Sequence, residues 1–154
     1  ELDCAFASCH PSLRHGLDWI SVKKDPLVAV LPKDYPVENG VFPVSGFSDE
    51  EFLMPSLGFD LDIMPVFNAQ EHKVSPHIRY TNLDDAALVS MVEHGLGACG
   101  LSRLVLRGRQ NSVRALPLAP RAVRERGIAA RPKKELRPIV RRFIQQSCEM
   151  IEKM

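Results

Sequence analysis

Three short turns are the segments of this sequence best suited to hold a small ligand. Ser8, Ser56 and Asn82 each follow an expected β-strand, in the turns Ala7-Ser8-Cys9, Pro55-Ser56-Leu57-Gly58 and Thr81-Asn82-Leu83. In open α/β sheets, ligands bind outside the carboxyl ends of strands and near helix N-termini. Unpaired backbone N–H groups at such places can bind a carboxylate or a similar acceptor. Although every α/β domain has such turns, the three together predict a binding site.

A glycine motif in the second half of the chain could instead indicate a nucleotide site. Gly95-Leu96-Gly97-Ala98-Cys99-Gly100 matches the pattern GxGxxG letter by letter. The dinucleotide fingerprint must follow a strand and open a helix, because the helix N-terminus faces the pyrophosphate. Here the motif follows an expected helix and opens an expected strand. The sequence therefore favours a turn that packs closely on a neighbouring element.

The acidic, histidine and cysteine residues form no catalytic or metal-binding pattern. The carboxylate pairs Asp60/Asp62 and Asp84/Asp85 both lie at expected helix starts, where the helix dipole already explains them. The five histidines share no helix face, and the four cysteines include no CxxC pair. We therefore expect no metal, no cofactor, cysteines that stay as free thiols, and no enzymatic activity.

The charge balance argues against a dedicated nucleic-acid or membrane-surface binder. Lys and Arg total 20 against 19 for Asp and Glu, a formal net charge of +1. Nine basic residues cluster late in the chain, and we expect a solvated helix face, with an interface or anion-contacting role as the alternative: Arg121, Arg124, Arg126, Arg131, Lys133, Lys134, Arg137, Arg141 and Arg142. No apolar stretch is long enough for a membrane span, and no signal peptide is visible. We expect a cytoplasmic fragment of a longer protein.

The elements that must position these residues alternate between short β-branched runs and helical stretches, which is typical of an α/β fold. Strands are expected at 2–7, 18–22, 27–31, 51–54, 76–80, 98–101, 113–118 and 127–130. Residues 23–26 are expected to form a turn, and residues 37–50 a surface connection. Helices are expected from about 60 to 68, from the Asn82 N-cap to a Gly95 C-cap, and from about 133 to the end. Pro65 fits the first of these helices only if it falls in the first turn.

Several segments, in this order, resemble the effector-binding domain of LysR-type transcriptional regulators. They are residues 3–8, Trp19, residues 25–36, 53–55, 84–97 and 114–118. The most specific pair consists of Leu27-Val28-Ala29-Val30-Leu31-Pro32 and Gly95-Leu96-Gly97. The resemblance extends from residue 1 to the closing helix, although no single motif decides it.

The resemblance implies an α/β fold of the type 2 periplasmic-binding-protein class, with two lobes and two crossovers. Residues 1–26 and 118–154 would form part of lobe I, and residues 27–117 would form lobe II. The chain would then be N-terminally truncated. The rest of lobe I and the DNA-binding winged helix-turn-helix would lie outside it.

Family members bind a small metabolite in the cleft between the lobes, and the resemblance assigns seven residues to that site. They are Ser8 from lobe I, and Ser56, Leu57, Gly58, Phe59, Asn82 and Leu83 from lobe II. Ser8 is neutral where some acid-binding members carry Arg, and Asp60 and Asp62 add negative charge nearby. Both departures weigh against a strongly anionic effector.

The expected function is therefore a sensor domain that binds a metabolite to control DNA binding and transcription. The resemblance implies a homo-oligomer, a dimer or tetramer when intact, that contacts DNA through the missing N-terminal domain. One alternative is the solute-binding protein of a transporter on the same fold, which predicts a signal peptide or lipid anchor upstream. Another is an enzyme with a carboxylate dyad, which predicts turnover that Asp84→Asn abolishes. A fold-level analogy alone does not establish function.

Overall fold

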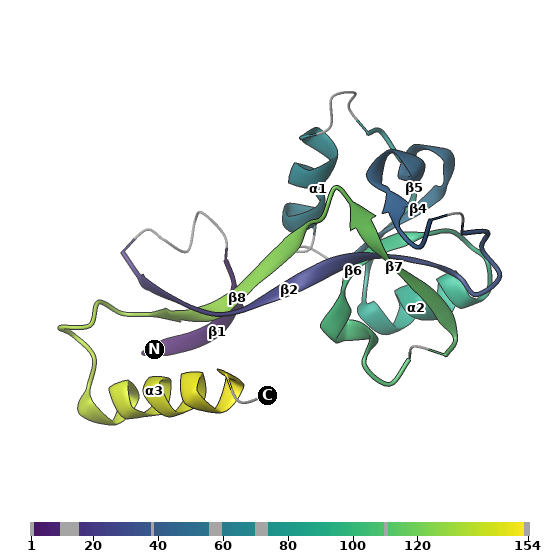
Figure 1. Cartoon of the computed structure of the whole chain (residues 1–154). Helices are drawn as coiled ribbons and strands as arrows, with labels where there is room; N and C mark the ends of the chain where they lie inside the picture. Colours follow the sequence, from purple (N-terminus) through teal and green to yellow (C-terminus); the bar gives the residue numbers. More distant parts are fainter. Residues whose placement is uncertain are drawn as a thin grey trace. The chain divides into compact units, whose positions relative to one another are not determined.

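The computed structural model describes residues 2–9, 16–37, 39–55, 60–69, 74–109 and 111–152 (Figure 1). The chain divides into unit 1, which consists of Glu1–Asp25 and Arg124–Met154, and unit 2, which consists of Pro26–Val123. The two strands β2 (Asp18–Pro32) and β8 (Val123–Ala130) carry the chain from one unit to the other. The boundaries between the two units therefore lie inside regular strands rather than in loops.

Strand β2 runs for 15 residues without a break, so the turn expected at residues 23–26 is wrong. The acidic residue that suggested the turn, Asp25, is buried, with only 1% of its surface exposed. Its Oδ2 accepts a hydrogen bond from Nε of Arg126 at 3.1 Å. Because a buried carboxylate needs such a partner, this pairing allows Asp25 to lie inside a strand.

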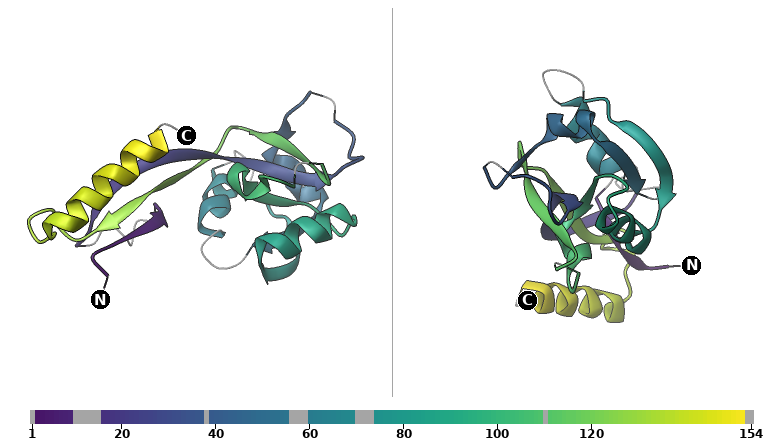
Figure 2. Two further views of the ribbon diagram at one scale, coloured as in Figure 1. Left: turned by 90° about the horizontal axis from the view of Figure 1, so that it is seen from below. Right: turned by 90° about the vertical axis from the view of Figure 1, so that its right-hand side faces the viewer.

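Unit 1 is a small antiparallel sheet covered by one helix. Strand β1 (Cys4–Ser8) pairs with β8 from Cys4 opposite Ala130 to Ser8 opposite Arg126, and β8 neighbours β2. Helix α3 (Pro138–Glu152) lies along these strands (Figure 2). The core of unit 1 is one buried cluster, to which β8 contributes Ile128 and Ala130 and α3 contributes Val140 and Ile144, together with Leu136. The helix starts five residues later than the expected residue 133, at a proline whose fixed φ suits the first helical position.

A glycine allows two strands of unit 1 to approach closely. A Cβ added to Gly127 on β8 would lie 2.2 Å from the carbonyl oxygen of Ile20 on β2. It would also lie 2.6 Å from the ring of Trp19, whose Nε1 donates to Glu125 at 3.0 Å. No side chain fits between these strands at that point.

Unit 2 has two small sheets. In the first, β2 pairs antiparallel with β6 (Cys99–Ser102) and with β7 (Val113–Ala119), and β7 pairs parallel with β3 (Phe42–Pro43). In the second, β4 (Glu51–Pro55) pairs parallel with β5 (His77–Leu83). The helical elements are α1 (Asp60–Asn68), α2 (Asp85–Glu93) and the short 3-10 helices η2 (Val44–Asp49) and η3 (Arg103–Leu106).

The core of unit 2 is built around four phenylalanine rings. The ring of Phe47 lies 4.7 Å from that of Phe42, 5.1 Å from Phe52 and 5.6 Å from Phe67, centroid to centroid. Phe42 and Phe47 come from β3 and η2, within the segment 37–50 that was expected to be a surface connection. That expectation is wrong, because Phe42, Val44 and Phe47 of this segment are buried in the core.

The expected helix 60–68 and the expected strands 51–54 and 113–118 are confirmed. Pro65, expected to fit only the first turn, is the sixth residue of α1, and Ala69 N–H still donates to its carbonyl at 3.0 Å. The C-terminal end of α2 has the glycine expected there. Gly95, at φ +73°, donates to Val92 O, and Leu96 donates to Met91 O, each at 3.0 Å. These two bonds are those of a Schellman motif.

The GxGxxG segment is a close-packed turn, as the sequence favoured. Gly97 has φ +153°, and a Cβ on it would lie 2.3 Å from the carbonyl oxygen of Glu51. Ala98 N–H donates to that same oxygen at 2.8 Å, and Leu53 N–H donates to Ala98 O at 2.9 Å. The glycine is required because β4 passes directly against this turn.

Candidate functional site

Ser8, the residue expected to contact a ligand from unit 1, lies at the carboxyl end of a strand. It is the last residue of β1, is half-buried and stands opposite Arg126 in the antiparallel ladder. The following residue, Cys9, continues this pairing through a 2.8 Å hydrogen bond from its N–H to Glu125 O. The strand-end position expected for Ser8 is therefore confirmed, while its contact with a ligand stays a prediction.

Within unit 2, the structure brings together the ends of two strands that carry expected site residues. Parallel pairing places Pro55, the last residue of β4, beside Leu83, the last residue of β5. Asn82 is exposed and Leu83 is half-buried against the core. The expected site residues Ser56, Leu57, Gly58 and Phe59 lie outside the described residues. The described part of this region thus has two strand ends side by side, as ligand sites of α/β sheets require.

Asn82 does not have the helix-capping role that the sequence suggested. Strand β5 extends through Leu83, and Asn82 adopts φ +61°, a left-handed conformation that asparagine tolerates better than most residues. The N-cap of α2 is Asp84, whose Oδ1 accepts a hydrogen bond from Ala87 N–H at 2.8 Å. Asn82 therefore does not belong to the helix terminus and lies exposed near the end of β5.

The two acidic residues after β5 lie at the N-terminus of helix α2. Asp84 is engaged as the N-cap, and Asp85 lies in the first turn, where the helix dipole favours a negative charge. A general acid–base dyad needs two groups that share a substrate, and Asp84 is already bonded to the backbone. The side chains of Asp60 and Asp62 lie outside the described residues.

The cysteines offer no reactive centre at the core. None of the four forms a disulfide, and Cys99 is completely buried in β6. Burial raises the pKa of the Cys99 thiol far above its ordinary value, which keeps it protonated and unreactive. Among the described residues, no group of three His, Cys, Asp or Glu side chains could hold a metal ion. No helix in the described ranges is long and apolar enough to span a membrane.

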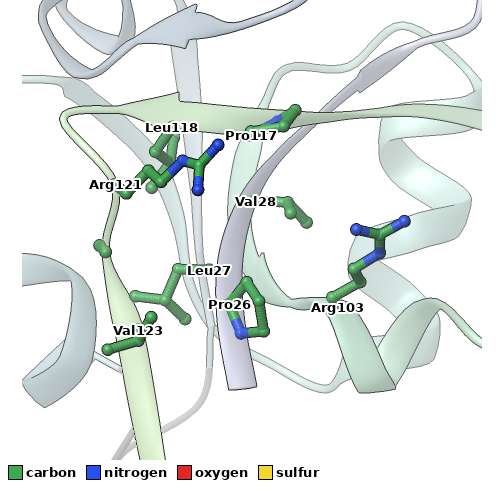
Figure 3. A pocket seen from close by; sticks show the side chains of 9 residues that line it. Pro26, Leu27, Val28, Arg103, Pro117, Leu118, Arg121 and Val123 are labelled. Carbon is green, nitrogen blue, oxygen red and sulfur yellow. The ribbon is translucent and has the colours of Figure 1, made fainter. Parts of the chain in front are cut away.

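A pocket in unit 2 is a feature that sequence inspection missed. This arginine pocket has a volume of about 260 Å³ and is lined by Pro26, Leu27, Val28, Arg103, Pro117, Leu118, Arg121, Ala122 and Val123 (Figure 3). Arg103 opens η3, and Arg121 follows β7. Its walls come from three stretches of chain that are far apart in sequence, residues 26–28, Arg103 and residues 117–123, so no local motif could have indicated it. The only sequence signal was the late cluster of basic residues, which includes Arg121.

Comparison with known proteins gives one family match. Residues 1–150 match the family model described as the LysR substrate binding domain. Because the match covers almost the entire chain, it includes the residues of both units. No curated protein matches the chain.

Solved structures show the same fold. The regulatory domain of CcmR from Synechocystis PCC6803, in complex with 2-PG, is 22% identical, with a TM-score of 0.84 over 99% of this chain and 74% of that one. The effector binding domain of QuiR in complex with shikimate is 19% identical, with a TM-score of 0.80 over 98% and 72%. The regulatory domain of MetR from N. meningitidis, a LysR family regulator, is 16% identical, with a TM-score of 0.74 over 98% and 69%.

Proposed function

The chain belongs to the LysR substrate binding domain family, whose fold is of the type 2 periplasmic-binding-protein class, and from this premise we propose that it senses a small-molecule effector. The match over residues 1–150 is the observation that carries the proposal. The similar solved structures are regulatory or effector-binding domains, which favours a transcriptional sensor over the solute-binding protein of a transporter.

We propose that the effector is a small polar metabolite and that Ser8, Ser56, Leu57, Gly58, Phe59, Asn82 and Leu83 contact it. The relatives support the class of molecule, because CcmR was solved with 2-PG and QuiR with shikimate. The strand-end positions of Ser8 and Asn82 support the residues. Sensing requires that the effector bind two conformations of the domain unequally, because only that difference shifts a population.

Thermal unfolding in the presence of small acids, amino acids and aromatic metabolites tests this proposal. A true effector at a hundred times its Kd stabilises the folded chain by about 2.7 kcal/mol. We expect Asn82→Trp to remove the stabilisation, because the added ring fills the space beside the strand end. Asn111→Trp, at another exposed asparagine, is the matched control and keeps it. The proposed site is wrong if a stabilising compound acts equally on the Asn82 variant.

We also propose that the intact regulator is a cytoplasmic homo-oligomer that binds DNA through a separate domain. Helix α3 supports the pairing, because Ile139, Phe143 and Met150 on it are 69%, 49% and 68% exposed. Exposed apolar side chains grouped on one element are typical of a protein interface. Sedimentation of Phe143→Glu and of the control Gln146→Glu checks this, and we expect only the former to shift the chain toward monomer.

A further inference from the structure

We propose that the arginine pocket of unit 2 binds a small organic anion, with its charged head held by Arg103 and Arg121 and its apolar body against the aliphatic walls. Figure 3 shows the two arginines on opposite sides of the pocket, with Val28 between them. Neither residue belongs to the effector site proposed above. The inference therefore concerns a second ligand site on the domain.

The positive charge of the two arginines in the pocket is not balanced by an acidic residue of the lining. The lining includes two arginines and no acidic residue. Within the part of the chain that the structure describes, neither Arg103 nor Arg121 forms an ion pair. By contrast, Arg126 pairs with Asp25 and Arg137 with Asp3. A guanidinium group is planar and binds carboxylate or phosphate oxygens through two parallel hydrogen bonds, so a pair of free ones favours an anion.

The walls of the pocket explain why the anion is organic. Seven of the nine residues that line the pocket have apolar side chains, and Val123 among them is 56% exposed. Apolar surface of this kind is best covered by an apolar group, whose burial removes both surfaces from water. An inorganic ion alone would leave it uncovered.

Three of the backbone positions that line the pocket have no N–H group to offer an anion. The N–H of Leu27 is already donated to Ala122 O at 3.0 Å, and prolines at 26 and 117 have no N–H to donate. The volume of about 260 Å³ lies just below the usual range of ligand cavities, so the pocket suits one compact molecule. A carboxylate and a phosphate share the required chemistry.

The pocket lies where the chain enters and leaves unit 2, so a ligand bound there can influence the conformation of these two segments. Pro26 and Val123 both line it, and they are the first and last residues of unit 2. A bound anion therefore contacts both segments through which the chain enters and leaves this unit. Its binding would bias any conformational change in which these two segments differ.

Isothermal titration of the whole chain with four probes tests the inference. Cyclohexanecarboxylate and cyclohexyl phosphate carry the two possible heads on one aliphatic body, cyclohexanecarboxamide lacks the charge, and inorganic phosphate lacks the body. We expect one or both of the organic anions to bind, and the amide and inorganic phosphate to bind at least about tenfold more weakly. Which organic anion binds more tightly identifies the head group. Added salt weakens the binding.

Variants locate the site. Arg103→Gln and Arg121→Gln each weaken the binding of the anion at least about tenfold, since each removes charge-assisted hydrogen bonds. Arg107→Gln, an exposed arginine next to η3 that does not line the pocket, is the matched control and binds as the unmodified chain does. All three residues are exposed, so circular dichroism is expected to show an unchanged fold.

Four outcomes overturn the inference. They are no binding of either organic anion at millimolar concentration, equal binding of the amide, equal binding of inorganic phosphate, and undiminished binding by the Arg103→Gln, Arg121→Gln double variant. Asn82→Trp separates this site from the effector site. If that variant loses the anion while the arginine variants keep it, the anion belongs to the effector site, and only the second-site inference fails.

Discussion

The two units of this domain bury their apolar residues in different ways. Unit 2 closes a core around Phe42, Phe47, Phe52 and Phe67, with sheet and helix residues on several sides. Unit 1 has a thin cluster beneath one helix, and its large rings Phe6 and Phe143 meet each other at 6.4 Å while remaining 58% and 49% exposed. A closed core provides stability, whereas exposed apolar rings are available to another surface. The comparison indicates that unit 2 supplies most of the stability of the chain and unit 1 an interaction surface.

Truncation of a core ring tests this difference most strongly. Phe47→Ala in unit 2 is expected to lower the free energy of unfolding by about 3–5 kcal/mol, because three neighbouring rings lose their partner. Ile144→Ala in unit 1 is expected to cost only about 2 kcal/mol, since its surroundings can collapse more easily. Urea denaturation measures both. Equal losses in the two variants would show that the cores are equivalent.

The close-packed glycines sharpen the comparison, because each unit has one. Gly97→Ala and Gly127→Ala are each expected to cost about 1–3 kcal/mol, since the new methyl group meets a carbonyl oxygen at 2.3 Å or 2.2 Å. Hydrogen exchange read by mass spectrometry should show the loss of protection in unit 2 for the first and in unit 1 for the second. Gly108→Ala is the control: at φ +82° with no atom within 4 Å, it should cost only the backbone strain of about 1–2 kcal/mol.

The N-cap of α2 offers a smaller and local test. Asp84→Ala is expected to destabilise unit 2 by about 1 kcal/mol, because it removes the acceptor for Ala87 N–H. Asp84→Asn should recover most of the loss, as asparagine is an equally good N-cap. The thermal midpoint measures both changes. An Asn variant as unstable as the Ala variant would show that charge, rather than the cap hydrogen bond, is what matters at this position.

The hydrogen bond from Tyr35 to Glu50 in unit 2 is expected to make the free energy of unfolding depend on pH only in alkali. Burial, followed by a 2.7 Å hydrogen bond to Glu50 and the charges of Glu50 and Asp49, raises the pKa of Tyr35 from 10.0 to about 12. Because the folded state prefers the neutral phenol, this contribution is complete below pH 10 and is lost as the pH rises toward 12. The ultraviolet absorbance of tyrosinate should show one late-ionising tyrosine, and Glu50→Gln should lower its pKa. An unchanged titration in that variant would contradict the assignment.

Local patterns predicted the elements whose residues decide their own conformation. The helix 60–68, the strand 113–118 and the glycine that ends α2 were all predicted, because apolar periodicity and capping residues act within a few positions. The N-cap was misplaced from Asp84 to Asn82, since both residue types cap equally well and only the length of β5 distinguishes them. For the expected effector site, the sequence indicated the strand ends, and the pairing of Pro55 with Leu83 added their proximity.

Sequence alone therefore determined the α/β class, most of the elements and the family resemblance, because these depend on residue types in a fixed order. Tertiary structure decided what depends on partners distant along the chain. Asp25 is buried within a strand, where Arg126, 101 residues later, pairs with its carboxylate. The arginine pocket likewise forms because the fold brings Arg103 and Arg121 to opposite sides of one aliphatic pocket. Burial and charge pairing between distant residues leave no local pattern in the sequence. Neither the buried Asp25–Arg126 pair nor the arginine pocket could therefore be predicted without the tertiary structure.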